Sequence, residues 1–338
     1  MDGVISGHSL VESYSMYGHV LSEYLGLAPK VCLTLAAGGA TACAGTAWAA
    51  TAVREGICDA VLVVHGDNRG SIALGGWGRS AARIGEVIAH PEFEQPYGLT
   101  AVAASALRAR AHMERHGTTR AQLSQVAVAM RAHAARNPKA MRRERISTDD
   151  VSASALVADP LHGLDCALIS DFAGAVVVTS LETARALARA PVRILGWGEG
   201  TTHKYVSQAP DLLTSGARAG GARAFAAAGV APGDVELAML YDAFTVYVLI
   251  LLEDLGFCAT GEAGSFVERG ALGPDGMLPT NTHGGMLSGA HGGSLHLTEA
   301  VRQLRGEAGP ERQVGARLAL VHGAGGSLSS HTTLVLGT

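Results

Sequence analysis

The sequence predicts an α/β fold in which one strand–helix–strand–helix–strand unit occurs twice. The first observation is an apolar run in each copy that leads into a glycine pair. The second is a helix pattern that follows the glycine pair and ends in Ala-Val-Arg. The third is a further apolar run closed by His-Gly. These features lie at Val31–Leu35, Gly38-Gly39, 52–54 and 60–66 in the first copy, and at 277–282, Gly284-Gly285, 300–302 and 318–323 in the second.

The similarity between the copies extends upstream of these features. The segment GHVLSEYLGL at 18–27 parallels VYVLILLEDLGF at 246–257, and each is an apolar stretch of helical period stopped by a glycine. Apolar strands that alternate with helices are typical of parallel sheets covered on both faces. We therefore predict two halves, at 1–185 and 186–338.

A different segment, at about 75–170, separates the two copies. It is richer in Arg and His and contains two helix patterns, at 98–116 and 120–135. We expect it to form an insertion on top of the first sheet. It also holds a basic cluster, most of which we interpret as a solvated face: Arg131, Arg136, Lys139, Arg142, Arg143 and Arg145.

The composition argues against several classes of protein. Hydrophobic residues make up 48% of the 338 residues and charged residues 17%, which favours a large buried core over disorder. The formal charge of -4 gives no indication of a nucleic-acid or polybasic membrane surface. The longest apolar run, around 246–252, is too short to span a membrane, and no signal peptide is predicted. The five cysteines form no CxxC pair, so we predict reduced thiols in a cytoplasmic protein and no metal site.

Five pieces of the sequence carry a family resemblance. They are YGLTAVAASALRARAHMERHG at 97–117, DPLHGLDCALISD at 159–171, LYDAFT at 240–245, NTHGGMLSGAHGG at 281–293 and HGAGG at 322–326. Together with the duplication they resemble the thiolase superfamily, in particular its lipid-transfer or sterol-carrier type. The resemblance implies a thiolase-like fold with layers in the order α-β-α-β-α. It also implies a coenzyme A thioester as substrate, no covalently bound cofactor, and a homodimer.

The short motifs of thiolases can be placed on this sequence. The position of the nucleophilic cysteine falls on Gly39, and that of the asparagine that holds an oxyanion-hole water falls on Tyr241. The histidine that donates to the thioester oxygen matches His291, and the acid/base cysteine falls nearest His322. Phe172 stands where relatives usually have glycine. The resemblance therefore implies a catalytic site that lacks the nucleophile.

The residue types at these positions indicate their chemistry. The Gly39 amide, at a helix N-terminus, can donate to an oxyanion. Tyr241 can donate a hydrogen bond or relay a proton, and His291 can donate to a thioester oxygen as an enolate develops. His322 can act as a general base. Structural alternatives stay open for all four: close packing for the glycine, a paired core hydroxyl for the tyrosine, and a buried, hydrogen-bonded ring for each histidine.

Three nearby residues are weaker candidates. Cys43 lies four residues into the helix, about 6 Å along its axis from the nucleophile position, and is interpreted as a small buried hydrophobe. Asp242 is expected to cap or anchor its loop. His283 precedes a glycine pair and has no role assigned by the motifs.

Three further residues are candidates for contacts with coenzyme A. We expect Gly325, in the glycine-rich stretch near the acid/base position, to present its backbone to the substrate. Arg142 and Arg143 are expected to meet the phosphates, because guanidinium groups form paired hydrogen bonds with phosphate oxygens.

Two classes of function are compatible with these residues. In the first, an enzyme makes or breaks a C–C bond beside a coenzyme A thioester without a covalent acyl-enzyme. Retro-aldol cleavage fits the missing cysteine, and the thiolase-like steroid side-chain aldolases resemble this chain in lacking it. They often have tyrosine where this chain has His291, so Claisen-type cleavage or thiolase-type acyl transfer stays open. In the second class, the chain is a non-catalytic acyl-CoA-binding scaffold subunit. The proton-handling side chains at the motif positions favour the enzyme.

The resemblance also implies a partner, because related subunits pair with a small OB-fold, zinc-ribbon companion protein. A gap between the two copies leads to a second expectation. The second copy begins with a strand-like run at 192–197 and a helix pattern near 212–228, whereas the first begins at the counterpart of Val235. We expect the first half to lack one strand, placed inside its sheet, and one helix. Either the natural protein starts upstream of Met1 or another chain fills the gap.

Overall fold

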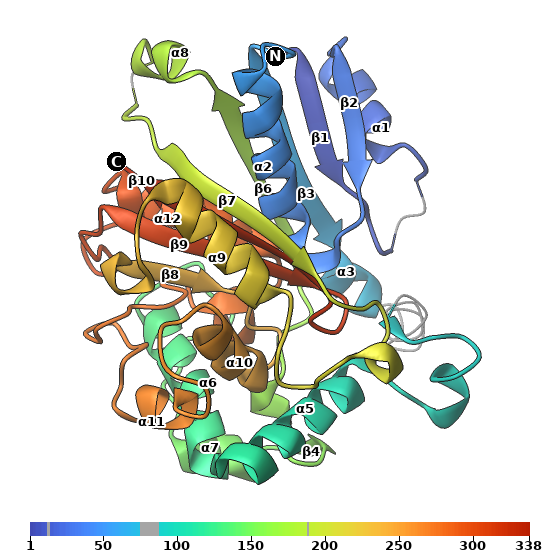
Figure 1. The fold of residues 1–338 in the computed structure, drawn as a ribbon, viewed down its shortest axis with the longest axis vertical. Helices are drawn as coiled ribbons and strands as arrows, with labels where there is room; N and C mark the ends of the chain where they lie inside the picture. The colour runs from blue at the N-terminus through green and yellow to red at the C-terminus, as the bar shows by residue number, and fades with distance from the viewer. Residues whose placement is uncertain (12–13, 75–87, 188) are drawn as a thin grey trace.

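Two four-stranded sheets form the frame of the molecule (Figure 1). The computed structural model describes residues 1–11, 14–74, 88–187 and 189–338. A layer of helices separates the sheets, and further helices cover the outer face of the second sheet and part of that of the first. The predicted α/β arrangement is confirmed.

The first sheet is built from the N-terminal part of the chain. Its strand order is β2–β1–β3–β6, with β1, β2 and β3 parallel and β6 antiparallel to β3. The register of β1 on β2 and β3 places the glycine turn that precedes α2 at the carboxyl edge of this sheet. The elements are β1 Gly3–Gly7, α1 Tyr17–Leu25, β2 Val31–Leu35, α2 Thr41–Arg54, β3 Ala60–Asn68, α3 Arg69–Leu74, β6 Asp171–Thr179 and α8 Leu181–Arg185.

The second sheet has the order β7–β10–β9–β8. Strands β8 and β9 are parallel, while β10 is antiparallel to both β9 and β7. The prediction of a strand at 277–282 is wrong, because among the described residues this stretch makes only one isolated β-bridge, from Thr280 to Ala238. The elements are β7 Arg193–Thr201, α9 Ala217–Ala228, β8 Leu237–Leu240, α10 Thr245–Asp254, α11 Ala263–Glu268, α12 Gly293–Leu304, β9 Leu318–Gly325 and β10 Ser330–Gly337.

The position of β7 corrects one expectation from the sequence. Strand β7 corresponds to the strand that we expected to be missing from the first half. We expected that missing strand to lie inside the first sheet. In the second sheet β7 lies at the edge, and β10 is its one partner strand among the described residues. The corresponding place in the first half is therefore the edge of β6, which has no outer partner strand in the described ranges.

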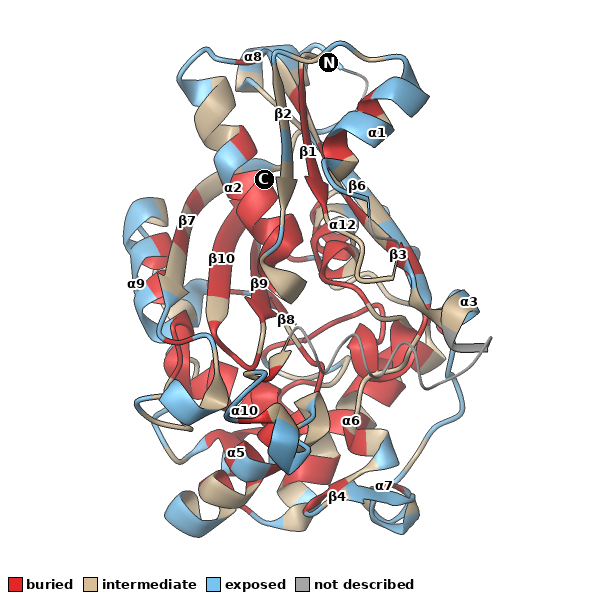
Figure 2. Cartoon of the chain, turned by 90° about the vertical axis from the view of Figure 1, so that its right-hand side faces the viewer, coloured by how far each residue is buried: buried red, intermediate tan, exposed pale blue. Residues whose placement is uncertain are grey.

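The middle layer consists of α2 and α12, which lie between the two sheets. Cys43 and Ala47 of α2 share one buried cluster with Leu297 and Ala300 of α12 and with Val321 of β9. Figure 2 shows that α2, β9 and β10 are largely buried, while α1 and α8 are exposed over much of their surface. The apolar content predicted from the composition is concentrated in this layer and in the second half.

The insertion packs against the second half, so its expected place on top of the first sheet is wrong. Helices α5 and α6 share a buried cluster with α10, and Figure 1 shows them beside α10 and α11 at the end of the molecule away from the N-terminus. All ten residues of α10 are buried. A helix that is apolar on every side has to be covered on every side, and the insertion provides that cover. Its elements are α5 Ala101–His116, α6 Arg120–Ala135, α7 Thr148–Ala153, β4 Leu156–Ala158 and β5 Leu161–His162.

No helix within the described ranges is both long enough and apolar enough to cross a membrane.

Candidate active site

Gly39 lies in the turn Gly38–Ala40 that precedes α2, where the two halves of the molecule meet. The first hydrogen bond of this turn runs from the Ala40 N–H to the Ala37 carbonyl, at 3.2 Å. The N–H of Gly39 comes one residue before the donor of that first bond, so it has no hydrogen-bond acceptor within the turn. On its other side Gly39 faces α12, because a β-carbon on Gly293 would lie 2.4 Å from the Gly39 carbonyl oxygen.

The ring of Tyr241 fills the space beside Gly39. A β-carbon placed on Gly39 would lie 2.0 Å from Tyr241 Cε2 and 2.4 Å from the Ala324 carbonyl oxygen. Neither distance is possible between non-bonded atoms, so no side chain fits at position 39 in this arrangement. The glycine at position 39 and the tyrosine at position 241 are therefore sterically coupled.

Tyr241 directly follows β8 and lies on a stack of aromatic rings. Its ring is 6.5 Å from that of Tyr247, at an angle of 24°. The Tyr247 hydroxyl accepts a hydrogen bond from Ser105 Oγ at 2.8 Å. Burial, and next the nearby Tyr247, raise the pKa of Tyr241 well above its ordinary value. Tyr241 therefore keeps its proton at neutral pH and is a hydrogen-bond donor.

His291 is held in one orientation by three hydrogen bonds. Its backbone N–H donates to Ser170 Oγ at 2.8 Å. Its ring Nδ1 lies 3.1 Å from the Leu168 carbonyl oxygen, and its Nε2 lies 3.1 Å from Arg69 Nη1. A carbonyl only accepts and a guanidinium only donates, so the proton is on Nδ1 and the lone pair is on Nε2. Burial, and next the Arg69 charge, lower the pKa of His291 to about 3.

This geometry differs from the role expected for His291. As the ring is held, both nitrogens have partners, and its one N–H, on Nδ1, is not free to donate to a thioester oxygen. The cationic donor beside it is Arg69, the first residue of α3, which the sequence analysis missed. The signal for it was available, because Asp67 and Arg69 stand at the carboxyl end of the apolar strand β3. Sites in α/β sheets gather at this end of the strands.

Phe172 closes this part of the site from β6. Its ring lies edge-on to the ring of His65, with 5.2 Å between the ring centres, and 6.2 Å from that of His291. A β-carbon on Gly292 would lie 2.3 Å from the Phe172 ring. The Phe172 ring therefore occupies space that a glycine at position 172 would leave open.

His322 lies on the other face of its strand. Successive side chains of β9 point to opposite faces of the sheet, and a β-carbon on Gly323 would contact Ala40 in the middle layer. The His322 ring points the other way, with Nδ1 2.8 Å from Thr333 Oγ1 and Nε2 3.1 Å from His331 Nδ1. The structure therefore does not bring His322 together with Gly39.

Asp242, which was expected to cap or anchor its own loop, instead holds the segment that follows the Gly284-Gly285 pair. Its carboxylate accepts the backbone N–H groups of Met286 and Leu287 at 2.9 and 3.3 Å. It also lies 3.1 Å from His296 Nε2. His283 packs edge-on to His296 in the buried interior, with both ring nitrogens unpaired among the described residues.

The candidates for coenzyme A contacts lie in different surroundings. Gly325 is packed against the chain that precedes α2, since a β-carbon there would lie 2.0 Å from the Ala37 carbonyl oxygen. Arg142 and Arg143 are exposed. The Arg142 backbone N–H donates to the Ser288 carbonyl at 3.0 Å, which ties this loop to the segment that leads to His291.

Cys43 is part of the hydrophobic core. It is 1% exposed, and burial raises the pKa of its thiol to about 12. Such a thiol stays protonated and is a poor nucleophile.

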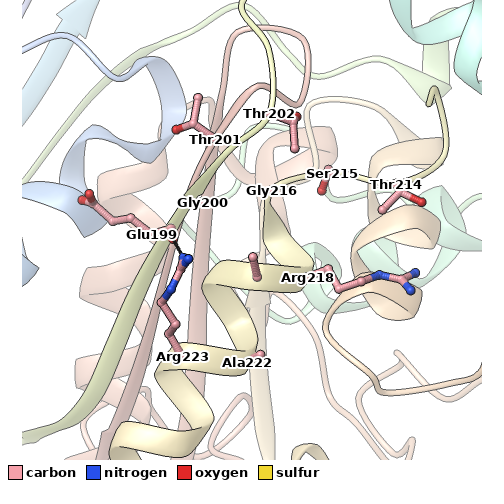
Figure 3. A pocket seen from close by; sticks show the side chains of 11 residues that line it. Glu199, Gly200, Thr201, Thr202, Thr214, Ser215, Gly216, Arg218, Ala222 and Arg223 are labelled. Carbon is pink, nitrogen blue, oxygen red and sulfur yellow. Dashed lines mark hydrogen bonds between the residues drawn. The ribbon is translucent and has the colours of Figure 1, made fainter. Parts of the chain in front are cut away.

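A separate cavity lies elsewhere in the molecule, and the described residues form no metal site. In the described part of the chain, no group of three or more His, Cys, Asp or Glu side chains is arranged to hold a metal ion. A cavity of about 540 Å³ lies between β7 and α9 (Figure 3) and is lined by residues such as Glu199, Arg218 and Arg223. It shares no lining residue with the cluster around Gly39.

Comparison with known proteins shows the family of this chain. A family model described as thiolase C-terminal domain-like matches residues 198–338. The 17-hydroxy-3-oxo-4-pregnene-20-carboxyl-CoA lyase of Mycobacterium tuberculosis is 39% identical over 288 residues, which are 80% of this chain and 72% of that protein. The chain belongs to the thiolase superfamily. A steroid side-chain-cleaving aldolase of Thermomonospora curvata is also 39% identical, over 80% of this chain and 71% of that protein.

A solved structure agrees with this membership. The structure named Ltp2-ChsH2(DUF35) aldolase has a TM-score of 0.88 and 33% sequence identity, and the match covers 100% of this chain and 87% of that one. The expected thiolase-like fold is confirmed. The expectation of a thiolase-superfamily enzyme that handles acyl-CoA thioesters is confirmed by the relatives.

Proposed function

We propose that this chain cleaves the bond between the α- and β-carbons of a β-hydroxyacyl-CoA by a retro-aldol reaction. The observation that carries the proposal is the Tyr241 ring, which fills the space that a cysteine side chain at position 39 would need. An acyl-enzyme has no attachment point there, whereas a retro-aldol step requires none. The lyase and aldolase names of the two relatives support the same reaction.

The proposed step moves one proton and one electron pair. The β-hydroxyl loses its proton and becomes a carbonyl, while the pair of the Cα–Cβ bond forms the thioester enolate. The α-carbon then takes up a proton, which releases a ketone or aldehyde and a shorter acyl-CoA. Tyr241 acts as a relay: it passes its own proton to a water molecule as it receives the β-hydroxyl proton, then gives a proton to the α-carbon and takes one back from that water. The Gly39 N–H donates to the thioester oxygen, where the enolate charge develops.

We place the coenzyme A moiety along the loop that carries Arg142 and Arg143. These guanidinium groups are exposed, and their loop is hydrogen-bonded to the segment before His291. Gly325, packed beside the turn before α2, would contribute backbone only. His322 has no step in this proposal, and we assign it to the packing of the second sheet.

The direct test is to incubate the protein with β-hydroxyacyl-CoAs and to detect the carbonyl product and the shortened acyl-CoA by mass spectrometry. The first substrate to use is the 17-hydroxy steroid CoA ester in the name of the M. tuberculosis relative. Equimolar release of both products supports the proposal. Transfer of the acyl group to a second thiol, with an acyl-cysteine detected on the protein, would show thiolase chemistry instead. Tight binding of the esters without any turnover would indicate a scaffold subunit.

We further propose a cytoplasmic homodimer that works with a small companion protein. Strand β2 is an edge strand whose outer side has no partner strand among the described residues, and Leu33 on β2 and Tyr24 on α1 are exposed beside it. An unpaired edge with apolar side chains supports pairing with a second copy. The name of the solved Ltp2-ChsH2(DUF35) aldolase supports a companion, which we expect to be an OB-fold, zinc-ribbon protein. Light scattering of the chain, alone and with the companion, tests both.

A further inference from the structure

Arg69 brings a positive charge into the candidate site. Its side chain is 13% exposed, and its Nε donates to Asp67 Oδ2 at 2.8 Å. Its Nη1 donates to His291 Nε2 at 3.1 Å, and its guanidinium carbon lies 5.6 Å from the centre of the Phe172 ring. Arg69 therefore stands between an anion, a neutral imidazole and an aromatic face.

The anion that holds Arg69 is itself firmly fixed. The Asp67 side chain is fully buried, and its Oδ1 accepts a hydrogen bond from Ser9 Oγ at 2.7 Å. Its Oδ2 accepts the Leu10 backbone N–H at 3.1 Å as well as Arg69 Nε. A carboxylate with this many donors stays ionised and gives Arg69 one preferred orientation.

His291 completes the positioning of Arg69 and gives up its own ability to donate. Its Nδ1–H is used by the Leu168 carbonyl, and its Nε2 lone pair is used by Arg69. Since the ring has no free N–H, the hydrogen-bond donor on this side of the site is the guanidinium. A guanidinium carries five N–H groups, of which these contacts use two, and Nη2 has no acceptor among the described residues.

The Arg69 charge also reaches the tyrosine beside the nucleophile position. Burial and Tyr247 raise the pKa of Tyr241, while the Arg69 charge acts in the opposite direction on the same hydroxyl. The guanidinium thus lies within electrostatic range of the group that we propose to move the proton. A charge in this place favours a negative oxygen formed between the two side chains.

We infer that Arg69 is a catalytic residue whose unused N–H groups stabilise the thioester enolate oxygen, in the place that a histidine N–H has in ordinary thiolases. This inference rests on the proposed retro-aldol function. As the Cα–Cβ bond breaks, its electron pair is delocalised onto the thioester oxygen, and Arg69 donates to that oxygen without transferring a proton. Asp67 and His291 are positioning residues that aim the guanidinium.

The first experiment measures binding and does not depend on turnover. Calorimetry compares two coenzyme A analogues: a nitronate thioether that imitates the enolate, and an alkyl thioether that lacks the acyl oxygen. Arg69→Ala is expected to weaken binding of the nitronate by about 10- to 100-fold, the usual loss for a hydrogen bond to a charged group. Binding of the alkyl thioether should change less than about 2-fold. An equal loss for both analogues would mean that Arg69 anchors coenzyme A or the fold, and would overturn the inference.

Two further variants separate charge from structure. Arg312 is matched to Arg69, because its side chain is 11% exposed and paired with Glu299 at 2.7 Å, and it lies outside the site. Arg312→Ala should leave the ratio of the two affinities unchanged. Arg69→Lys retains the charge without the planar fork and should recover part of the nitronate affinity. If Arg69→Ala does not fold, Arg69→Lys alone decides, because an affinity ratio equal to that of the wild type would contradict a directed guanidinium donor.

Kinetics then distinguish this inference from the proposed function. With an active β-hydroxyacyl-CoA, Arg69→Ala should lower kcat by about 10²–10³-fold with little change in KM. Guanidinium chloride at millimolar concentration should restore part of the activity of Arg69→Ala and none of that of Arg312→Ala. A wild type that binds the nitronate through Arg69 but cleaves no β-hydroxyacyl-CoA would overturn the proposed function alone. Full activity of Arg69→Ala in a wild-type background that cleaves would overturn the Arg69 inference alone.

Discussion

The two halves of the molecule contain the same pattern of strands and helices but differ in how far that pattern is buried. In the second half, β7 pairs with β10, and α9 covers the outer face of that pair. In the first half, the side of β6 opposite β3 has no partner strand among the described residues. As a result β10 is buried from His331 to Gly337, whereas every second residue of β6 is exposed at Ala173, Ala175 and Val177.

The helices show the same contrast. All ten residues of α10 are buried, while α1 buries only Gly18 and Ser22. An apolar strand–helix pattern therefore does not produce a core by itself, and the elements packed on its outer face decide how much of it is removed from water. The site uses both halves, with Gly39 and Arg69 from the first and Tyr241 and His291 from the second. The comparison predicts that proton transfer belongs to the second half and that stability is unequally distributed.

The largest expected effect is on proton transfer. Tyr241→Phe removes the hydroxyl proposed as the relay and should lower turnover of a β-hydroxyacyl-CoA by about 10²–10³-fold, with ester binding little changed. The matched control is Tyr247→Phe, which removes a hydroxyl bonded to Ser105 from the neighbouring ring of the stack. Stopped-flow kinetics and calorimetry check both variants. Similar turnover in the two variants would remove Tyr241 from the mechanism.

The second prediction concerns the unequal cover of the two sheets. Val177 on β6 and Val335 on β10 both lie on an antiparallel strand and point to the outer face of its sheet. Val177 is 55% exposed, whereas Val335 is 0% exposed. Val335→Ala should cost about 2–3 kcal/mol of unfolding free energy, because it opens a cavity under α9. Val177→Ala should cost less than about 0.5 kcal/mol. Urea denaturation measures both, and equal losses would show that β6 is covered in solution.

The sequence predicted the elements of this fold better than their packing. The helix predicted at 120–135 has these bounds because Thr119 and Gln122 form a capping box at its start. The sequence aligned His65 with His322, but these side chains are not equivalent. His65 extends from the same face of β3 as Val61 and Val63, which pack on α2, whereas His322 points away from the middle layer. A shift of one residue along a strand moves a side chain to the opposite face of the sheet, and sequence similarity between the two copies does not determine that register.

The site was predicted in part for a similar reason. The motif positions identified Gly39, Tyr241 and His291, which the structure brings to the junction of the halves. Arg69 was missed because no thiolase motif contains it, and its position depends on a contact between residues that are 222 apart in sequence. The tautomer of His291 was also inaccessible from the sequence, because the Leu168 carbonyl that fixes it comes from a loop of the insertion.

The third prediction uses the buried histidines of the second sheet. Burial, and next the charges of Arg108 and His203, lower the pKa of His331 to about 4, although the Leu328 carbonyl opposes this. The folded state therefore holds a neutral His331, while the unfolded chain takes up a proton below a pH of about 6.5. Stability should be complete above that pH and should fall towards pH 4, by about 1 kcal/mol per pH unit for this group.

The variant that tests this prediction is His331→Gln. It retains a polar side chain next to His322 but cannot be protonated, so the loss of unfolding free energy between pH 6.5 and pH 4 should become shallower. In the first half, His65→Gln provides the comparison, because burial and next Arg69 lower the pKa of His65 to about 4 as well. Urea titrations across this range measure both slopes. A slope unchanged by His331→Gln would mean that its ring is protonated in the folded state.

The smallest expected effect is that of replacing Cys43, the only cysteine close to the nucleophile position in the sequence. Counted from the glycine at the start of each middle-layer helix, Cys43 of α2 corresponds to Leu297 of α12, and both lie in the same buried cluster. The two halves thus use these positions for packing, and burial raises the pKa of the Cys43 thiol to about 12. Cys43→Ala should leave turnover within about 3-fold and cost about 1 kcal/mol of stability. Intact-protein mass spectrometry during turnover should find no acyl adduct on Cys43. An adduct there would indicate a thiolase-type mechanism with a covalent acyl-enzyme.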